Sequence, residues 1–367
     1  MFLMSIISFI LILVIILFFL RKYFKGAQCK IKHSMKGKVV IITGASAGLG
    51  KESALDLVKH GAKVILACRN EEKTKQAMKS LSEEEKKLVK FIHIDLCDFD
   101  SILKFNEKIR EENIKIDILM NNAGLFSQNF EKSKDNMECY LQGNFVGHVL
   151  LTFLLFDMLD KKEARIINLS SLAHLNTDYK DIINIKEMYD IQKSELKYFQ
   201  NIRGRGTLYG NTKVLMIYFS KFLAKLCEGK YNYIKSAALH PGAVDTEFMR
   251  FLNKKNYPYL SVFAKIFLPL TKFIFKTPED GAQTQLHLCY LPFNELISGG
   301  YYSDCKIKKT DDFVNDTERI MESMKLTINE IKKRIPETKI FDICNDLFKN
   351  KYPKLYLYIS LFLLTFH

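Results

Sequence analysis

The chain has 367 residues, of which 48% are hydrophobic and 26% charged, so it can bury a sizeable core and is not of disordered composition. No Pro/Gly/Ser-rich or low-complexity stretch divides it, which predicts one large α/β domain with terminal extensions. The net charge of +14 is spread along the chain without a finger, basic-helix or aromatic-platform motif, so no nucleic-acid partner is expected.

The first twenty residues form an apolar segment in which Ser5 and Ser8 are the only polar side chains. About twenty apolar residues is the length of a helix that crosses a bilayer. Positive charges follow this segment instead of preceding it, which favours a retained transmembrane signal anchor over a cleaved signal peptide. The basic residues of 21–36 then predict that the rest of the chain faces the cytosol, with the endoplasmic reticulum as the expected membrane.

The eight cysteines are scattered, and none belongs to a Cys-x-x-Cys pair. This spacing predicts neither a zinc site nor a disulfide framework, so no metal is expected. Free thiols in a reducing compartment agree with a domain that faces the cytosol.

A short β-branched run at 38–43 predicts a buried parallel strand. It leads into a glycine-rich turn and then a helical pattern that ends at Gly61. Glycines allow the backbone to approach a pyrophosphate at the amino terminus of the helix, where free N–H groups and the helix dipole favour anions. The cofactor-binding candidates in this turn are Gly44, Ser46, Gly48, Leu49 and Gly50.

The second predicted strand, 63–67, ends at the position that should face the adenosine ribose. An acidic residue there would favour the free ribose of NAD, but the sequence has Arg69. An arginine can pair with a 2′-phosphate, so NADP is preferred to NAD, and a solvated surface cation is the alternative.

Polar groups also follow the next two predicted strands, 91–94 and 116–120. Ligands bind beyond the carboxyl ends of the strands in an open parallel sheet. Asp95, with Leu96 beside it, could hydrogen-bond an adenine, although an ordinary strand-ending turn is the alternative. The second of these strands leads into a further candidate cofactor turn, formed by Asn122, Ala123 and Gly124.

A fifth predicted strand, 165–169, ends near Ser171 on the same edge of the sheet. Much further along the chain, Tyr209 and Lys213 lie four residues apart at the start of a predicted helix that continues over 214–226. This spacing places both side chains on one helix face, where the ammonium would make the phenol more acidic and suited to proton transfer. A second pair, Tyr189 and Lys193, has the same spacing, but a long apolar helix and small intervening residues favour Tyr209.

Taken together, these residues resemble the short-chain dehydrogenase/reductase family over about residues 36–306. The motifs are TGASAGLG at 43–50, NNAG at 121–124, the Ser171 region, YGNTK at 209–213 and HPGAVDT at 240–246. The resemblance implies a doubly wound α/β Rossmann fold with a mainly parallel, seven-stranded sheet. It implies that Ser171, Tyr209 and Lys213 are catalytic and that Asn144 holds a water beside Lys213. It also implies that the nicotinamide is covered by Pro241, Gly242, Val244 and Thr246, with Thr246 bonding its amide.

Within that family, LACRN at 66–70 and NFVGHVLLT at 144–152 are most similar to the microsomal, NADP-preferring retinol dehydrogenases. That resemblance implies a lipophilic alcohol or carbonyl substrate, with a steroid or other lipid carbonyl as the alternative. A catalytically silent scaffold is the other alternative, and a homodimer is left open. The expected organisation is an anchor (1–20), a basic juxtamembrane linker (21–36), a catalytic domain (37–310) and a C-terminal helical extension with an apolar tail (311–367). An inserted loop at 172–208 and a substrate lid or membrane-facing segment at 247–278 interrupt the catalytic domain.

Overall fold

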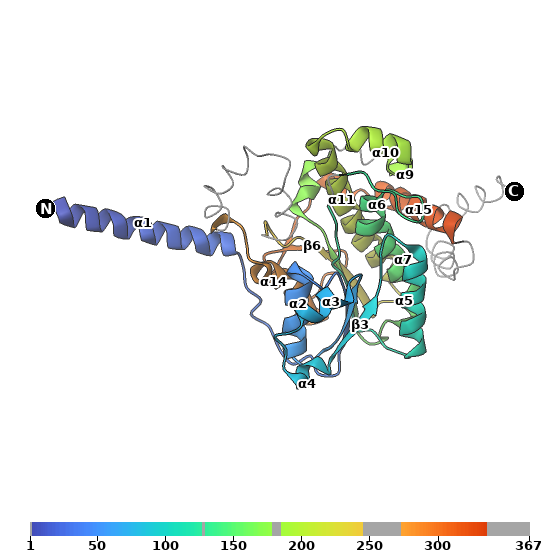
Figure 1. The fold of residues 1–367 in the computed structure, drawn as a ribbon, viewed down its shortest axis with the longest axis horizontal. Helices are drawn as coiled ribbons and strands as arrows, with labels where there is room; N and C mark the ends of the chain where they lie inside the picture. The colour runs from blue at the N-terminus through green and yellow to red at the C-terminus, as the bar shows by residue number, and fades with distance from the viewer. Residues whose placement is uncertain (1, 127–128, 178–184, 245–272, 336–367) are drawn as a thin grey trace.

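The sheet begins with the β-branched run after Lys38, which forms the central strand β1. This computed structural model describes residues 2–126, 129–177, 185–244 and 273–335 (Figure 1). The strand order is β3-β2-β1-β4-β5-β6-β7-β8. Every neighbouring pair is parallel except β7 and β8. The strands are β1 (Val39–Thr43), β2 (Lys63–Cys68), β3 (Val89–His93), β4 (Ile118–Asn121), β5 (Ala164–Leu169), β6 (Ile234–Leu239), β7 (Tyr301–Ser303) and β8 (Lys306–Lys308).

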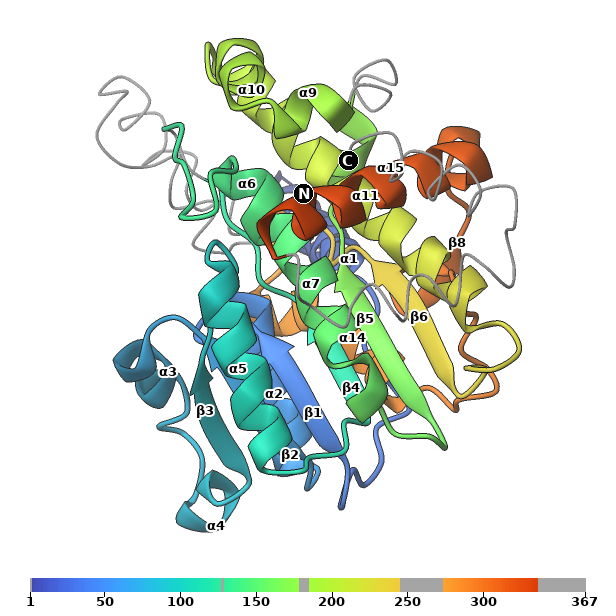
Figure 2. The ribbon, with the colours of Figure 1, turned by 90° about the vertical axis from the view of Figure 1, so that its right-hand side faces the viewer.

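Helices cover both faces of the sheet, because successive side chains of a strand point to opposite sides. Ile41 packs into one core cluster, whereas its neighbours Val40 and Ile42 pack into the other. The first face carries α5 (Phe99–Glu111), α7 (Gly147–Leu154) and α11 (Ile202–Cys227), seen in front of the sheet in Figure 2. The second carries α2 (Gly48–Lys59) and α14 (Pro278–Tyr290). The doubly wound α/β fold is therefore confirmed.

The prediction of seven strands is wrong, because the described residues form eight. The additional strand β8 pairs antiparallel with β7 through a two-residue turn at Asp304 and Cys305. Both turn residues have positive φ, +48° and +56°, as a type I′ hairpin turn requires. Such turns usually carry Asn-Gly or Asp-Gly, and β8 has only three exposed residues, so the sequence gives little signal for this hairpin.

The helix that carries Tyr209 begins two turns earlier than the sequence predicts. Asn201 caps it, its side chain accepting a hydrogen bond from the N–H of Gly204 at 2.8 Å. Gly204 and Gly206 lower the helical propensity of these first turns, which hides the true start in the sequence. The region expected as an inserted loop is also partly helical in its described residues, with η3 (Leu172–Asn176), α9 (Ile185–Tyr189) and α10 (Ile191–Tyr198).

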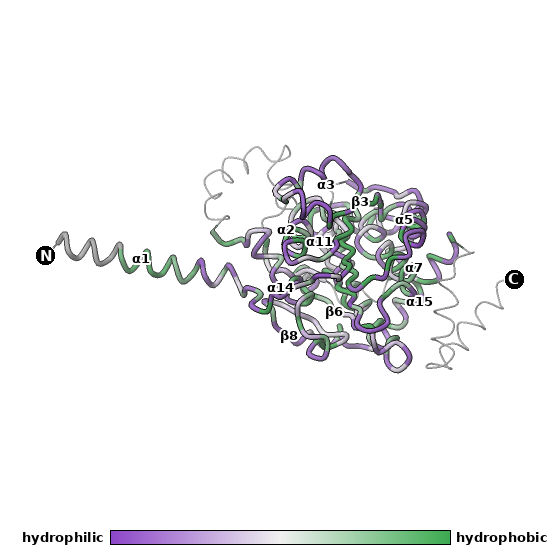
Figure 3. Tube along the Cα trace, turned by 90° about the horizontal axis from the view of Figure 1, so that it is seen from below, coloured by the Kyte–Doolittle hydropathy of each residue, from purple (hydrophilic) through white to green (hydrophobic). Residues whose placement is uncertain are grey.

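The amino terminus forms helix α1 (Phe2–Lys25), which extends away from the sheet domain (Figure 3). Over the described residues, no helix combines the length and the hydropathy of a membrane span. The expected transmembrane helix therefore stays a prediction.

The C-terminal extension begins with α15 (Thr317–Arg334), which packs on α11 through residues such as Met324 and Ile328. The expected apolar tail and most of the predicted lid lie outside the described residues. Shorter helices connect the layers: α3 (Glu71–Ala77), α4 (Glu83–Lys86), α6 (Cys139–Leu141), η1 (Gln142–Val146), η2 (Phe156–Met158) and η5 (Asp312–Asn315).

Candidate active site

A cavity of about 560 Å³ opens at the carboxyl edge of the sheet, where the strand order reverses between β1 and β4. Chains leaving these two strands turn to opposite faces of the sheet, which leaves a crevice for a ligand. Most predicted site residues line the cavity: Gly44, Ser46, Gly48, Leu49, Arg69, Asp95, Leu96, Asn122, Ala123, Gly124, Ser171, Tyr209, Lys213, Pro241, Gly242 and Val244. Gly50 and Asn144 are not part of the lining, and Thr246 lies outside the described residues.

The glycine turn after β1 leaves no room for side chains. Gly44 has φ +70°, and a Cβ there would lie 2.9 Å from the Cα of Ala123. A Cβ on Gly50 would lie 2.5 Å from Nδ2 of Asn122. Ala47, the N-cap residue of α2, provides no side-chain cap, so the first N–H groups of the helix stay free of a capping side chain where Gly48 and Leu49 line the cavity. This arrangement fits the pyrophosphate of a dinucleotide.

Two cations lie where the adenosine ribose of such a dinucleotide would bind. Arg69 is exposed directly after β2, and Lys73, in the following helix α3, also lines the cavity. Asp95 lies across the cavity, and its Oδ1 accepts the N–H of Cys97 at 2.9 Å. The edge of the cavity next to β2 therefore carries more positive than negative charge.

The turn after β4 is held by a buried hydroxyl that the sequence analysis overlooked. Thr43 Oγ1 accepts the backbone N–H groups of both Asn122 and Ala123 at 2.9 Å. His148 Nε2 lies 3.0 Å from the same hydroxyl, and its Nδ1 lies 3.3 Å from the carbonyl of Asn144. Burial, together with the charge of Lys213, lowers the pKa of His148 to about 3, so its ring is neutral. With its proton on Nδ1, the ring donates to the carbonyl of Asn144, which can only accept. Nε2 is then free to accept from the hydroxyl of Thr43.

Asn144 lies in the π-helix η1 and fixes the chain just beyond this turn. Its Oδ1 accepts the N–H of Leu125 at 2.7 Å, and its Nδ2 donates to the carbonyl of Leu125 at 3.0 Å. The intervening Gly124 leaves space for the ammonium of Lys213, since a Cβ there would lie 3.3 Å from Nζ. π-Helices are frequent at functional sites. The water-holding role expected for Asn144 stays a prediction.

Tyr209 and Lys213 meet at the end of β5. The Lys213 ammonium lies 5.5 Å from the centroid of the Tyr209 ring and donates to the carbonyl of Leu169 at 3.0 Å. The hydroxyl of Ser171 hydrogen-bonds the Tyr209 side chain. Ser170 joins the strand to the helix, its hydroxyl donating to the carbonyl of Lys213 at 2.7 Å. The phenol, the ammonium and a serine hydroxyl thus share one wall of the cavity.

The alternative pair, Tyr189 and Lys193, lies elsewhere. Tyr189 ends α9 and Lys193 lies in α10, so the two side chains do not share a helix face. The Tyr189 hydroxyl donates to Thr327 at 2.8 Å, and the exposed Lys193 pairs with Asp190 at 3.5 Å. Neither residue lines the cavity.

The sequence predicts that Lys213 lowers the pKa of Tyr209. The protein chain alone does not show this lowering. Burial raises the pKa of Tyr209 to about 12, and the hydrogen bond with Ser171 opposes that shift only in part. Burial also lowers the pKa of Lys213 to about 8. At neutral pH the phenol keeps its proton and the amine keeps its charge, so Tyr209 is poised as a proton donor.

The comparisons with known proteins agree with this geometry. A model of the short chain dehydrogenase family matches residues 38–180. Retinol dehydrogenase 12 of Mus musculus is 36% identical over 301 residues, which cover 82% of this chain and 88% of that protein. The chain belongs to the short-chain dehydrogenase/reductase family. Retinol dehydrogenase 13 of Mus musculus, 34% identical over 82% of this chain and 85% of its own length, also places this family member close to the retinol dehydrogenase group.

Solved structures of other proteins share the fold of this dehydrogenase/reductase. An uncharacterized protein from Mycobacterium paratuberculosis aligns with a TM-score of 0.63 at 20% identity, covering 84% of this chain and 98% of that one. Salutaridine reductase from Papaver somniferum aligns with a TM-score of 0.53 at 21% identity, covering 72% of this chain and 99% of that one. At these identities the likeness concerns the fold alone.

Family membership gives this dehydrogenase/reductase a nicotinamide cofactor, NAD or NADP, and a reaction at a CH–OH group. The glycine turn and the uncapped start of α2 fit such a dinucleotide. Sequence reasoning missed Thr43, His148 and Lys73, of which only Lys73 lines the cavity. Phe275, which also lines it, lies in the predicted segment 247–278. His148 follows Asn144 by four residues in a helical segment. This spacing could have predicted the contact between the two residues.

Proposed function

We propose that the protein is a membrane-anchored, NADP-dependent oxidoreductase that interconverts a lipophilic alcohol and its aldehyde or ketone. The observation that carries this proposal is the meeting of Tyr209, Lys213 and Ser171 on one wall of a cavity whose other wall is the glycine turn after β1. A reactive carbonyl placed between these walls faces a proton donor on one side and the dinucleotide site on the other.

In the proposed reaction, Tyr209 acts as the acid. A reduced nicotinamide held by the glycine turn would supply the hydride that the carbonyl carbon needs. The Tyr209 hydroxyl gives its proton to the carbonyl oxygen, so the substrate gains one hydride and one proton and leaves as the alcohol. Ser171 donates a hydrogen bond to the same oxygen, and the Lys213 ammonium stabilises the phenolate that remains. In the reverse direction the phenolate accepts the proton from the alcohol.

Membrane anchoring and a lipophilic substrate are supported by helix α1 and by the relatives. The described apolar side chains of α1 up to Leu20 are exposed to solvent, and the cationic Arg21, Lys22 and Lys25 follow them. Such a cationic flank favours the cytosolic side of a membrane. The similar proteins are named retinol dehydrogenases, and retinoids are lipophilic. We infer that the catalytic domain faces the cytosol at the endoplasmic reticulum.

A substrate panel tests the proposed function. Membranes that contain the full-length protein should reduce retinal or another lipophilic aldehyde or ketone with NADPH, and oxidise the matching alcohol with NADP. The measurement is the initial rate of cofactor oxidation for each substrate, with NADPH and NADH in parallel. If the protein binds NADPH but turns over no member of a broad lipophilic panel, the proposed activity is wrong.

Cofactor choice is tested separately at Arg69. Replacing Arg69 with alanine should weaken NADPH binding roughly 10- to 100-fold, the effect of losing one hydrogen bond to a charged group, and leave NADH binding unchanged. Fluorescence titration of each cofactor gives both dissociation constants. Lys79→Ala is the matched control, because this exposed cation follows α3 without lining the cavity. An equal loss for both cofactors would contradict the 2′-phosphate role.

A further inference from the structure

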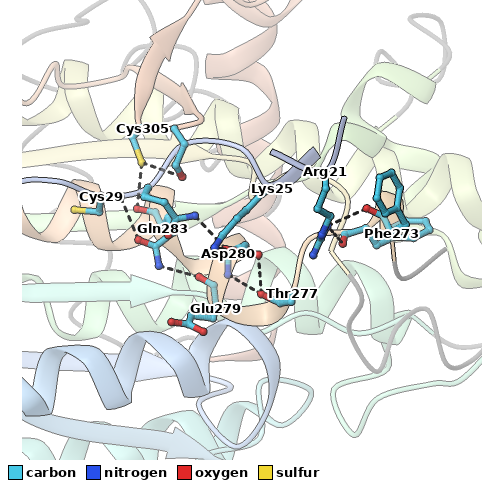
Figure 4. Close-up of polar contacts among 12 residues, drawn as sticks. Arg21, Lys25, Cys29, Phe273, Thr277, Glu279, Asp280, Gln283 and Cys305 are labelled. Carbon is cyan, nitrogen blue, oxygen red and sulfur yellow. Dashed lines mark hydrogen bonds and ion pairs between the residues drawn. The ribbon is translucent and has the colours of Figure 1, made fainter. Parts of the chain in front are cut away.

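The last turns of α1 are fixed to a wall of the cavity by one side chain. Nη1 of Arg21 donates a hydrogen bond to the backbone oxygen of Phe273 at 2.9 Å (Figure 4). The same atom donates to the backbone oxygen of Phe275 at 3.2 Å, and Phe275 lines the cavity. The ring of Phe24 packs edge to face on that of Phe273, with centroids 6.3 Å apart. The helix and this wall cannot separate without losing both charged hydrogen bonds and the ring contact.

The chain beyond α1 stays attached to the domain along the start of α14. Lys25 pairs with Asp280 at 3.4 Å, and Gln28 donates to the same carboxylate at 3.1 Å. The Asp280 side chain is only 7% exposed, so it relies on these partners more than a surface carboxylate would. The N–H of Cys29 then donates to the side chain of Gln283 at 3.1 Å (Figure 4). The expected juxtamembrane linker is thus bonded to α14 over this stretch.

A tight turn joins α1 to this stretch. Gly26 has φ +73°, and a Cβ there would lie 2.4 Å from Nζ of Lys276 and 2.5 Å from Oδ1 of Asp304. Lys276 and Asp304 form an ion pair of 2.7 Å directly against this backbone, and Lys276 is buried. The positive φ and this close approach favour glycine at the turn, which lets the chain pass directly over the ion pair between α1 and the stretch bonded to α14.

Before Arg21, the described side chains of α1 do not pack on the domain. They are 42% to 63% exposed at Leu11, Ile12, Val14, Ile15, Ile16, Leu17, Phe18, Phe19 and Leu20. Near-consecutive positions at 100° per residue cover the whole circumference of a helix, so the apolar surface is not a single stripe. Hydrocarbon on every side is the environment that such a surface fits, and the cations at Arg21, Lys22 and Lys25 fit the lipid headgroups.

We propose that the Arg21 contacts hold the Phe275 wall of the cavity at the lipid surface, so that an apolar substrate passes from the bilayer into the cavity without crossing bulk water. The inference rests on the proposed function, because it takes α1 as a membrane anchor and the substrate as lipophilic. Arg21 is a positioning residue, and it takes no part in the reaction. Arg21 belongs to the end of α1 and its guanidinium bonds two carbonyls of the cavity wall, which places the wall at the headgroup depth that Arg21 itself occupies.

The test compares Arg21→Ala with Lys22→Ala in the full-length protein, reconstituted in phosphatidylcholine vesicles that contain phosphatidylserine. Both changes remove one positive charge from the same helix end, so they weaken attraction to anionic lipid equally. Lys22 is exposed, whereas Arg21 holds the two carbonyls. The substrates are a long-chain aldehyde that partitions into the vesicles and a short, water-soluble aldehyde.

Arg21→Ala should raise the KM for the long-chain aldehyde roughly tenfold or more, because the variant loses two hydrogen bonds of a charged group, and leave kcat unchanged. Its KM for the short aldehyde should equal that of the wild type, and Lys22→Ala should match the wild type with both substrates. Phe24→Ala, which removes only the ring contact with Phe273, should shift the KM for the long-chain aldehyde in the same direction. Flotation of the vesicles shows that each variant remains bound to lipid.

Negative results can distinguish a failure of the proposed function from a failure of this inference alone. If the wild type does not float with vesicles, or its KM for the long-chain aldehyde does not depend on lipid, the proposed anchoring or substrate class fails, and this inference fails with it. If the wild type depends on lipid but Arg21→Ala, Phe24→Ala and Lys22→Ala behave alike, the inference alone is overturned. Crosslinking of α1 to a second copy in place of lipid would also overturn it.

Discussion

Replacing Tyr209 with phenylalanine should lower kcat for carbonyl reduction about 10²- to 10⁴-fold, the usual contribution of a positioned acid. The change removes one hydroxyl, which is the proposed proton donor to the substrate oxygen. The ring is retained, and with it the edge-to-face contact with Phe126 at 5.7 Å. Folding and cofactor affinity should therefore be preserved. Single-turnover kinetics with a lipophilic aldehyde, together with a cofactor titration, measures both effects.

Tyr189→Phe provides a matched control for this experiment. It removes the same atom from a tyrosine with the same spacing to a lysine, and it loses a hydrogen bond to Thr327 far from the cavity lining. Loss of a hydrogen bond of this kind costs about 1 kcal/mol of stability. We expect a slightly lower Tm and an unchanged kcat. Equal loss of kcat in both variants would show that Tyr209 is not the acid.

The edge of the sheet where these residues meet could be predicted from the sequence. Buried parallel strands appear as short β-branched runs, and each is followed by polar residues or glycines at its carboxyl end. Asp95, Asn122 and Ser171 follow three different strands, and the rule that ligands bind at this edge brings them together without any knowledge of the structure. Local signals suffice here because the position of each residue is set by its own strand.

Other features depend on contacts between distant parts of the chain. The support of the Asn122 turn by Thr43 joins residues 79 positions apart, and the contact of Arg21 with Phe273 spans 252 positions. The hydrophobic periodicity of a sequence does not reveal contacts between residues so far apart. The high pKa of Tyr209 has the same origin, because spacing shows that Lys213 is near but not how much water burial removes. The β8 hairpin was missed for a local reason, since Asp304 and Cys305 adopt positive φ without a glycine.

Lys213→Met should lower kcat/KM for carbonyl reduction about a hundredfold near pH 7, the usual effect of removing one stabilising donor from a site. The phenolate left on Tyr209 would then have no cation beside it. Methionine has a similar length and can be buried without charge, so the fold should be retained. This variant separates the electrostatic role of the ammonium from its packing in α11.

The pH dependence tests the same assignment with the wild type. The pKa of Lys213 falls from 10.5 to about 8 on burial, so its charge is present below about pH 8 and is lost above it. Reduction of a carbonyl should therefore be constant from pH 6 to 7.5 and fall as the pH rises through about 8. In Lys213→Met this fall should disappear. A reduction rate that rises through pH 8 in the wild type would contradict the role of the ammonium.

The lowered pKa of Lys213 also predicts how the free energy of unfolding changes with pH. Between about pH 8 and pH 10.5 the unfolded chain binds the Lys213 proton and the folded chain does not, so this group makes the free energy of unfolding rise with pH over that interval. Below about pH 8 the folded protein must keep a buried ammonium, which donates a hydrogen bond to the carbonyl of Leu169. Buried thiols such as Cys68 and Cys289, whose pKa burial raises, lower stability over the same interval in both the wild type and Lys213→Met. Urea unfolding at pH 7 and pH 9.5 should therefore show a change in the free energy of unfolding that is more positive in the wild type than in Lys213→Met. Burial also lowers the pKa of Lys221, so the assignment to Lys213 depends on the loss of both pH effects in Lys213→Met.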